Sequence, residues 1–463
     1  MPVPSVPSKV DVVVIGAGFA GLAAGVRLAD AGLRIAVLEE APRLGGRASA
    51  FSDRETGERV DNGQHVLFGC YRETYTFLRR IGTAERAPLQ PRLSLPIASS
   101  GGRLFHLTCP DLTPPWHLLA GVLRWRALDM ADRWSALRMA GLVREARRSG
   151  AQAVADRVPP EQTVNDWLRK QRQSSRLCQW LWHPLAIAAL NQSPDTAAAA
   201  PFVRVVAELF GPRREDAAVG IARVPLDELY AEPARRFIEA RGGSVLVGAR
   251  ATVHADETDR RCTHVSTGGA TIAADAVVST VPWHAFDRIW PDAPPASMRG
   301  IARDAAAITG SPIVTVNLWF DRAAMPEPFV GFADGPMHWA FDKSAIFGGQ
   351  AGHIAAVASG ADELVDLSNG EITRIAVSQL QASLPGMRRS DLRRAVVVRE
   401  RRATFSLAPG SPPRPGTRTS LAGFYLAGDW TDTGLPATIE GAVLSGHLAA
   451  DAVLMDEPRT RRV

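Results

Sequence analysis

Three glycines near the N-terminus have the spacing of a phosphate-binding turn. They occur in the run Gly16-Ala17-Gly18-Phe19-Ala20-Gly21. The first glycine allows a tight turn, the second lets the backbone approach a pyrophosphate, and the third allows the following helix to pack closely on the preceding strand. The unpaired N–H groups that begin a helix attract phosphate. The run, including Phe19 and Ala20, therefore predicts a dinucleotide site.

Two acidic residues follow about 20 residues after the glycines, where such sites place a carboxylate. Glu39 closes the next apolar run, and Glu40 comes directly after it. A carboxylate here accepts hydrogen bonds from the hydroxyls of an adenosine ribose and disfavours a 2′-phosphate. Both residues are therefore predicted to bind the cofactor, but they do not separate FAD from NAD.

A strand, a helix and a second strand are needed to position these residues. Residues 10–15 form a continuous apolar run, which is typical of a strand buried on both faces of a parallel sheet. Residues 16–31 are predicted to form a helix that ends at Gly32, and residues 34–39 to form a second buried strand. Together they predict a Rossmann-type βαβ unit.

The rest of the chain changes character several times, and the predicted fold class is α/β. A cofactor-binding domain is interleaved with an α+β substrate domain, and the chain visits the cofactor domain three times. The cofactor-domain segments are 1–90, 226–300 and 396–463, while 91–225 is a mostly helical substrate or membrane domain and 301–395 supplies a sheet and a helix to the substrate site.

Composition describes an ordinary globular protein. The 463 residues are 46% hydrophobic and 22% charged, which excludes a disordered, collagenous or coiled-coil chain. The net charge of +5 rests almost wholly on Arg, and it fits an anionic membrane surface as well as a nucleic acid; no nucleic-acid partner is predicted. The four cysteines lie far apart, so neither a metal site nor a disulfide framework is predicted.

The expected location is the cytoplasm. The first nine residues contain three prolines and no apolar signal region, so they are expected to form a short disordered lead. Elsewhere Arg or Asp interrupts the apolar stretches before the ~20 residues that a membrane span requires.

Motifs at both ends of the chain resemble the flavin amine oxidase and carotenoid desaturase superfamily. Gly45-Gly46-Arg47 follows the second strand, and Gly428-Asp429 follows the last one. The resemblance implies that the turn and Arg47 contact the phosphates and the flavin edge of FAD, which makes FAD the expected cofactor. Asp429 would bind the ribityl hydroxyls or the nearby backbone.

Three further segments are included in the predicted FAD site. The helix that begins near Thr438 and Ile439 would direct its positive end at the flavin. Ala251 starts another predicted strand, at 251–255. Gly63-Gln64-His65 resembles the desaturase-type loop at the mouth of the flavin site. Its histidine is either a proton donor near the flavin or a loop histidine bonded to backbone, and the sequence leaves both open.

The whole chain resembles one branch of this superfamily, the hydroxysqualene dehydroxylases of hopanoid biosynthesis. The segments that carry this resemblance are 63–71, 182–185, 189–191 and 424–441. It implies a C30 isoprenoid alcohol as substrate and squalene as product. The allylic hydroxyl would be replaced by hydride from the reduced flavin, and a nicotinamide or a partner reductase would donate the electrons.

Such a reaction needs a general acid, because the hydroxyl must leave as water. The candidates, in order, are His65, His183, Asp342 and Glu440. Aromatic faces would stabilise a developing allylic cation. The candidate aromatics are Trp180, Trp182, Trp319, Trp339 and Phe341.

Other functions remain open at this stage. An FAD-dependent polyprene desaturase would transfer hydride in the opposite direction. An amine oxidase is disfavoured, because residues 438–442 lack the family's amine-cage aromatic and residues 311–320 lack its flavin-proximal Lys. A non-catalytic isoprenoid-binding chaperone is the alternative from another class, although such proteins tend to lose the flavin motifs.

A membrane contact follows from the expected substrate, because a C30 hydrocarbon resides in the bilayer. Residues 114–148 mix Trp and Leu with Arg, as a helix lying on a membrane surface would. Peripheral docking at the inner face of the cytoplasmic membrane is therefore expected. An amphipathic helix packed on its own domain is an equally good interpretation.

Overall fold

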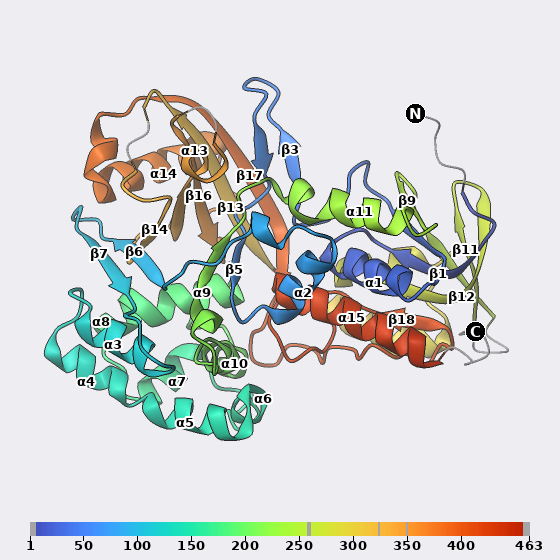
Figure 1. Cartoon of the computed structure of the whole chain (residues 1–463), viewed down its shortest axis with the longest axis horizontal. Helices are drawn as coiled ribbons and strands as arrows, with labels where there is room; N and C mark the ends of the chain where they lie inside the picture. The colour runs from blue at the N-terminus through green and yellow to red at the C-terminus, as the bar shows by residue number, and fades with distance from the viewer. Residues whose placement is uncertain (1–5, 257–260, 323–324, 349–350, 457–463) are drawn as a thin grey trace.

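The computed structural model describes residues 6–256, 261–322, 325–348 and 351–456. Two large sheets lie at opposite ends of the molecule, and a layer of helices lies below the second one (Figure 1). The first five residues of the expected N-terminal lead fall outside the described residues.

The cofactor-domain sheet contains the predicted βαβ unit. Its strand order is β10-β11-β12-β1-β2-β9, with β18 beside β12. Because β1 runs parallel to both β12 and β2, the carboxyl ends of these strands share one edge, where a ligand can bind. The strands are β1 (Lys9–Ile15), β2 (Ile35–Glu39), β9 (Ser244–Val247), β10 (Thr252–Asp256), β11 (Arg261–Thr267), β12 (Ala270–Ser279) and β18 (Phe424–Leu426).

Two helices from opposite ends of the chain pack together on this sheet (Figure 1). They are α1 (Phe19–Asp30) and α15 (Ile439–Asp456), and α2 (Arg72–Arg80) and α11 (Glu232–Glu239) flank them. Gly446 lies where α15 crosses α1, and a Cβ there would stand 2.2 Å from the carbonyl oxygen of Ala20. The absence of a side chain therefore sets how closely the two helices approach.

The second sheet is mostly antiparallel and forms the floor of the substrate side. Its order is β17-β13-β16-β15-β14-β6-β7, and only β14 and β6 run parallel among its pairs. The strands are β6 (Ser94–Ala98), β7 (Leu104–Thr108), β13 (Gly310–Phe320), β14 (Phe329–Phe332), β15 (Trp339–Asp342), β16 (His353–Ser359) and β17 (Leu392–Phe405). Two small two-stranded antiparallel sheets pair β3 (Ala50–Ser52) with β4 (Arg59–Asp61) and β5 (Val66–Phe68) with β8 (Val219–Ile221).

Most of the remaining α-helices lie in the helical layer. The layer contains α3 (Trp116–Arg124), α4 (Met130–Leu137), α5 (Ala140–Ser149), α6 (Ala151–Ala155), α7 (Val164–Lys170), α8 (Ser175–Leu177), α9 (His183–Leu190) and α10 (Ala199–Leu209). The others are α12 (Arg299–Ala307), α13 (Lys343–Phe347) and α14 (Asn369–Ser383). In the described part of the chain no helix is long and apolar enough to cross a membrane.

The α/β prediction is confirmed, and the structure differs from the sequence expectation in three places. Residues 114–148 form three helices instead of one, because the backbone is extended at Trp125 and Asp129 caps a new helix with its carboxylate. The helix expected within 301–395, which the sequence places at 362–384, starts only after the capping residue Ser368. Strand β17 was not predicted, and the expected domain boundary at residue 396 lies inside it.

The crossing of α1 and α15 yields a stability prediction. Gly446→Ala forces a methyl group against backbone that cannot move aside, so it should lower the free energy of unfolding by about 1–3 kcal/mol. Gly370→Ala on α14 is the matched control, because its added Cβ meets nothing within 4 Å. Denaturant unfolding of the two variants checks this, and equal midpoints would contradict the close-packing argument.

Candidate flavin site and substrate cavity

A cavity of about 1070 Å³ extends from the glycine turn to the helical layer. Its lining at one end includes Gly18, Glu39 and Arg47, and at the other end Trp116 on α3 and Val143 on α5. The volume exceeds the ~300–1,000 Å³ of a typical small-ligand site. The cavity can therefore hold a nucleotide cofactor and a second, apolar ligand in contact with it.

The glycine turn has the geometry that phosphate binding requires. Gly16 has a φ of +99°, and its carbonyl oxygen stands 1.9 Å from where a Cβ of Gly21 would lie, so neither position tolerates a side chain. Thr280, at the end of β12, clamps the turn by donating from Oγ1 to the carbonyl of Ile15 at 2.8 Å. The start of α1 is thereby held open toward the cavity, where Phe19 and Ala20 also line the wall.

The acidic residue predicted to bind ribose is held by backbone. Glu39 accepts hydrogen bonds from the N–H groups of Ala17 at 2.8 Å and Ala41 at 2.9 Å. Glu40 and Ala251 line the same end of the cavity. The carboxylate of Glu39 is therefore fixed at the carboxyl end of β2, beside the glycine turn.

The Gly45-Gly46 turn is held by a tyrosine from a distant segment. Both glycines have positive φ, +110° and +55°. The hydroxyl of Tyr230 donates to the carbonyls of Gly45 at 2.8 Å and Ala48 at 2.9 Å, and its ring stacks on Phe19 at 3.6 Å. One side chain thus ties the second glycine turn to the first.

Arg47 and Asp429 form a bidentate ion pair inside the cavity wall. Arg47 donates to the two carboxylate oxygens of Asp429 at 3.0 and 2.5 Å and to the carbonyl of Ala403, on β17, at 3.0 Å. Asp429 is buried, and the ring of Trp283 lies 5.5 Å from the guanidinium carbon. The pair therefore links a residue near the start of the chain to one near its end in the wall of the site.

The remaining residues predicted to bind the cofactor also line the cavity. They are Gly63, Gln64, Gly428, Thr438 and Ile439. The hydroxyl of Ser445, on α15, accepts a hydrogen bond from the N–H of Gly428 at 2.8 Å, which fixes the turn after β18 against that helix.

His65 is the one candidate acid that lines the cavity among the four named from sequence. Its Nε2 is buried and has no hydrogen-bond partner among the described residues. Burial lowers the pKa of His65, Asp61 opposes this shift, and Lys343 reinforces it. Burial thus favours the neutral form of the ring.

The other three candidates lie outside the cavity lining, and two of them cap helices. Asp342 accepts from the N–H of Ala345 at 3.0 Å and caps α13. Glu440 accepts from the N–H groups of Glu73 and Thr74 at 3.0 and 2.9 Å and so caps α2. His183 begins α9, and burial lowers its pKa.

The far half of the cavity is apolar and aromatic. Four of the five aromatics proposed from sequence line it, namely Trp180, Trp182, Trp339 and Phe341. The fifth, Trp319, is not part of the lining; its ring stacks on His353 at 4.3 Å, and its Nε1 donates to Glu58 at 2.7 Å. The cavity thus joins a polar half at the glycine turns to a long apolar half.

Sequence reasoning missed the residues that hold the glycine turns and Arg47 in place. These are Thr280, Tyr230, the backbone of Ala403, and Trp283. Each belongs to a segment far along the chain from the motif it supports, and none forms a motif of its own. Only the tertiary fold reveals them.

Comparison with known proteins is consistent with this geometry. A family model described as flavin containing amine oxidoreductase matches residues 19–454. The chain belongs to this family. Membership of this flavin-containing family makes the chain an FAD-dependent oxidoreductase, so the predictions of FAD as cofactor and of oxidoreductase chemistry are confirmed.

Two relatives match this flavin-containing oxidoreductase along nearly its whole chain, and a solved structure shares its fold. The chain is 32% identical to the hydroxysqualene dehydroxylase of Rhodopseudomonas palustris, over 95% of this chain and 97% of that protein. It is 25% identical to the 15-cis-phytoene desaturase of an Oncidium hybrid cultivar, over 97% of this chain and 79% of that protein. A solved oxidoreductase from Methanosarcina mazei shares the fold, with a TM-score of 0.73 at 16% identity over 96% of this chain and 100% of that one.

FAD fits the site on the chain's own geometry. The turns at Gly16 and Gly45 lack side chains, so the backbone before α1 can approach a pyrophosphate closely, and Glu39 stands where a ribose would bind. The Arg47–Asp429 pair lies farther along the same wall, between the phosphate turns and the apolar half.

The ion pair yields a cofactor-binding prediction. Arg47→Lys removes the bidentate contact while keeping the charge, and Asp429→Asn leaves the guanidinium without a counter-charge. Each should weaken FAD binding at least tenfold, or by about 1.4 kcal/mol, and the double variant should lose less than the sum because the residues act together. Titration of the apoprotein with FAD, followed by flavin fluorescence, measures this. Additive losses would contradict the pairing.

Proposed function

We propose that the chain is an FAD-dependent hydroxysqualene dehydroxylase that converts hydroxysqualene to squalene. The observation that carries the proposal is the similarity to a hydroxysqualene dehydroxylase along nearly the whole chain. Two features of the cavity support it. Its far half is apolar enough for a C30 chain, and the imidazole of His65, whose Nε2 is buried and has no hydrogen-bond partner among the described residues, lines the same cavity.

Different groups would supply the hydride, the proton and the stabilisation of positive charge in such a reaction. Reduced FAD, when bound, supplies the hydride. His65 gives a proton to the hydroxyl oxygen, so that the oxygen leaves as water. Trp180, Trp339 and Phe341 present aromatic faces to the positive charge that develops at the allylic carbon, and the apolar walls exclude solvent.

A polyprene desaturase is the second candidate, because a phytoene desaturase also matches along almost the whole chain. That reaction would take hydride from the substrate and would need no acid to remove a hydroxyl group. For the dehydroxylase, electrons must also reach the flavin from outside the substrate, and a nicotinamide or a partner reductase is the proposed source.

A peripheral membrane contact is part of the proposal, because the cavity opens among exposed apolar side chains. Trp116, Met130 and Trp134 are 59%, 62% and 64% exposed, and Trp116 also lines the cavity. Arg144 and Arg147, both on α5, line the same end of the cavity. Aromatic side chains next to Arg suit the headgroup region of an anionic bilayer, from which a C30 substrate could enter directly.

Anaerobic single turnover tests the reaction. Photoreduced protein incubated with hydroxysqualene should form squalene while its flavin is reoxidised. His65→Gln should slow this by about 10²–10⁴-fold, because it removes the general acid. His183→Gln should change the rate little, because His183 lies outside the cavity lining. Absence of squalene, together with desaturation of a polyprene by the oxidised enzyme, would favour the desaturase.

Vesicle flotation tests the membrane contact. The protein should float with phosphatidylglycerol vesicles, and the double variant Trp116→Ser with Trp134→Ser should bind about tenfold more weakly. Met455→Ser is the matched control, because Met455 is 75% exposed but lies at the end of α15, in the cofactor domain. Equal flotation of the double variant and the control would refute docking through this face.

A further inference from the structure

Gln64 lines the cavity and carries an amide group of which the described residues bind only one side. Its Oε1 accepts a hydrogen bond from Nζ of Lys343 at 2.6 Å. In the described part of the chain its Nε2 has no hydrogen-bond partner. A primary amide has one acceptor oxygen and a nitrogen with two N–H donors. Because the oxygen is bound, the amide of Gln64 can offer a ligand its donors.

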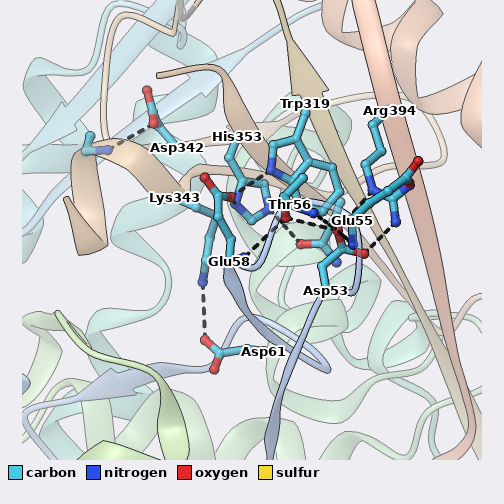
Figure 2. A network of polar contacts seen from close by, with 12 residues as sticks. Asp53, Glu55, Thr56, Glu58, Asp61, Trp319, Asp342, Lys343, His353 and Arg394 are labelled. Carbon is cyan, nitrogen blue, oxygen red and sulfur yellow. Dashed lines mark hydrogen bonds and ion pairs between the residues drawn. The ribbon is translucent and has the colours of Figure 1, made fainter. Parts of the chain in front are cut away.

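Lys343 determines which side of this amide is bound. Only 3% of the Lys343 side chain is exposed, and its Nζ lies 3.2 Å from Oδ2 of Asp61 and 3.8 Å from the ring centroid of Phe347. Figure 2 shows the side chain extending from the start of α13 to Asp61. Burial lowers the pKa of Lys343, but the Asp61 carboxylate raises it and so favours the ammonium form. An ammonium group has N–H donors and no acceptor, so it holds the amide oxygen toward itself and leaves the nitrogen on the other side.

The loop that carries Gln64 is itself fixed near the cofactor end of the cavity. Oδ1 of Asp61 accepts a hydrogen bond from the N–H of Leu226 at 3.1 Å. The side-chain amide of Asn62 donates to the carbonyl of Arg47. The loop is therefore tied to the turn that carries Arg47, and a polar group on such a fixed support can orient a ligand.

The cavity wall that follows this loop is apolar. Val66 packs on a buried cluster that includes Phe341 and Val357, and all three line the cavity. Phe347, which contacts Lys343, packs on the same cluster. An unpaired donor in such a wall costs free energy, because a hydrocarbon cannot replace the water that the donor gives up. A site of this kind binds a ligand with an oxygen acceptor in preference to one that lacks it.

We propose that Gln64 donates a hydrogen bond from Nε2 to the hydroxyl oxygen of the substrate, and that Lys343 is the positioning residue that orients the amide for this contact. The inference rests on the dehydroxylation proposed above and adds the residue by which the enzyme distinguishes its alcohol substrate from its hydrocarbon product. The hydroxyl oxygen has two lone pairs, so it can accept from Gln64 and also take a proton from His65. Once the hydroxyl has left as water, the product has no acceptor for the amide, which favours release of the product.

Equilibrium binding to the oxidised holoenzyme tests the contact, because oxidised flavin has no hydride to donate and the alcohol stays intact. Hydroxysqualene and squalene are added from the same detergent micelles, and binding is followed by the change in the flavin absorption spectrum. The wild type should bind hydroxysqualene on the order of tenfold more tightly than squalene. Gln64→Met keeps the length of the side chain and removes the amide, so it should bind the two ligands about equally.

Gln381→Met is the matched control for the loss of an amide. Gln381 is a partly buried glutamine on α14, and it lies outside the cavity lining. The control should keep the wild-type preference for the alcohol.

The double variant Lys343→Met with Asp61→Asn tests the positioning role. Removing the lysine alone would leave the buried Asp61 without its counter-charge, so both charges are removed together. The amide can then turn, and the preference for the alcohol should fall at least about threefold, while squalene binding and FAD content stay the same. A structural defect alone would weaken binding of both ligands alike, so an unchanged preference refutes the role of Lys343.

The binding preference and the reaction separate this inference from the proposed function. If the wild type makes no squalene but prefers the alcohol, and Gln64→Met loses this preference, the dehydroxylation is wrong and the contact with an alcohol oxygen stands. If the wild type shows no preference, or Gln64→Met keeps it, the amide does not bind the hydroxyl. A weaker affinity of Gln64→Met for FAD at an unchanged preference would assign the amide to the cofactor and would likewise overturn the inference.

Discussion

The ion pair between Arg47 and Asp429 is the contact on which the site depends. The two residues are 382 positions apart, and the same guanidinium also binds the backbone of β17 in the substrate sheet. One side chain therefore joins the first and last passes through the cofactor domain to the floor of the substrate cavity. Because Asp429 is buried, removing either partner would leave an uncompensated charge in the cavity wall.

Several carboxylates of the enzyme accept hydrogen bonds from backbone N–H groups and so hold local structure in place. Glu39 holds the glycine turn, Glu440 caps α2, and Asp342 caps α13. A carboxylate that accepts two or three hydrogen bonds from backbone is a poor proton donor. Of the four candidate acids, His65 is the one whose side chain lines the cavity.

Much of the cofactor half could be predicted from sequence, because its signals are local. The glycine run, the strand that ends at Glu39 and the Gly45-Gly46 turn are each read within a few residues, and each lies where the fold needs a tight turn or a close approach. FAD itself followed from the resemblance carried by Arg47 and Asp429. The similarity of the whole chain to isoprenoid enzymes is likewise visible in sequence.

The other features could not be predicted from the sequence. They depend on contacts between residues far apart in the chain, or on a hydrophobic pattern that does not mark where one helix ends and the next begins. Strand β17 is half exposed and rich in Arg, so it lacks the apolar alternation of a strand. The three helices at 116–149 form one continuous amphipathic pattern, and the extended backbone at Trp125 and the cap at Asp129 divide the first helix from the second. Residues such as Glu58 and His353 are unremarkable in sequence and become neighbours only when the 53–58 loop packs on the second sheet.

Strand β17 has a mechanical consequence. It pairs with β13 along nearly its whole length (Figure 1). Arg394 near one end is bound to Asp53, and Ala403 near the other end is bound to Arg47. Because β17 is bound near both of its ends, it resists a hinge motion between the cofactor half and the substrate half of the enzyme. Under the proposed function, a long product would then leave through the same mouth by which the substrate entered. Under the proposed function, turnover would be governed by how readily the surrounding lipid takes up a hydrocarbon, and not by a domain movement.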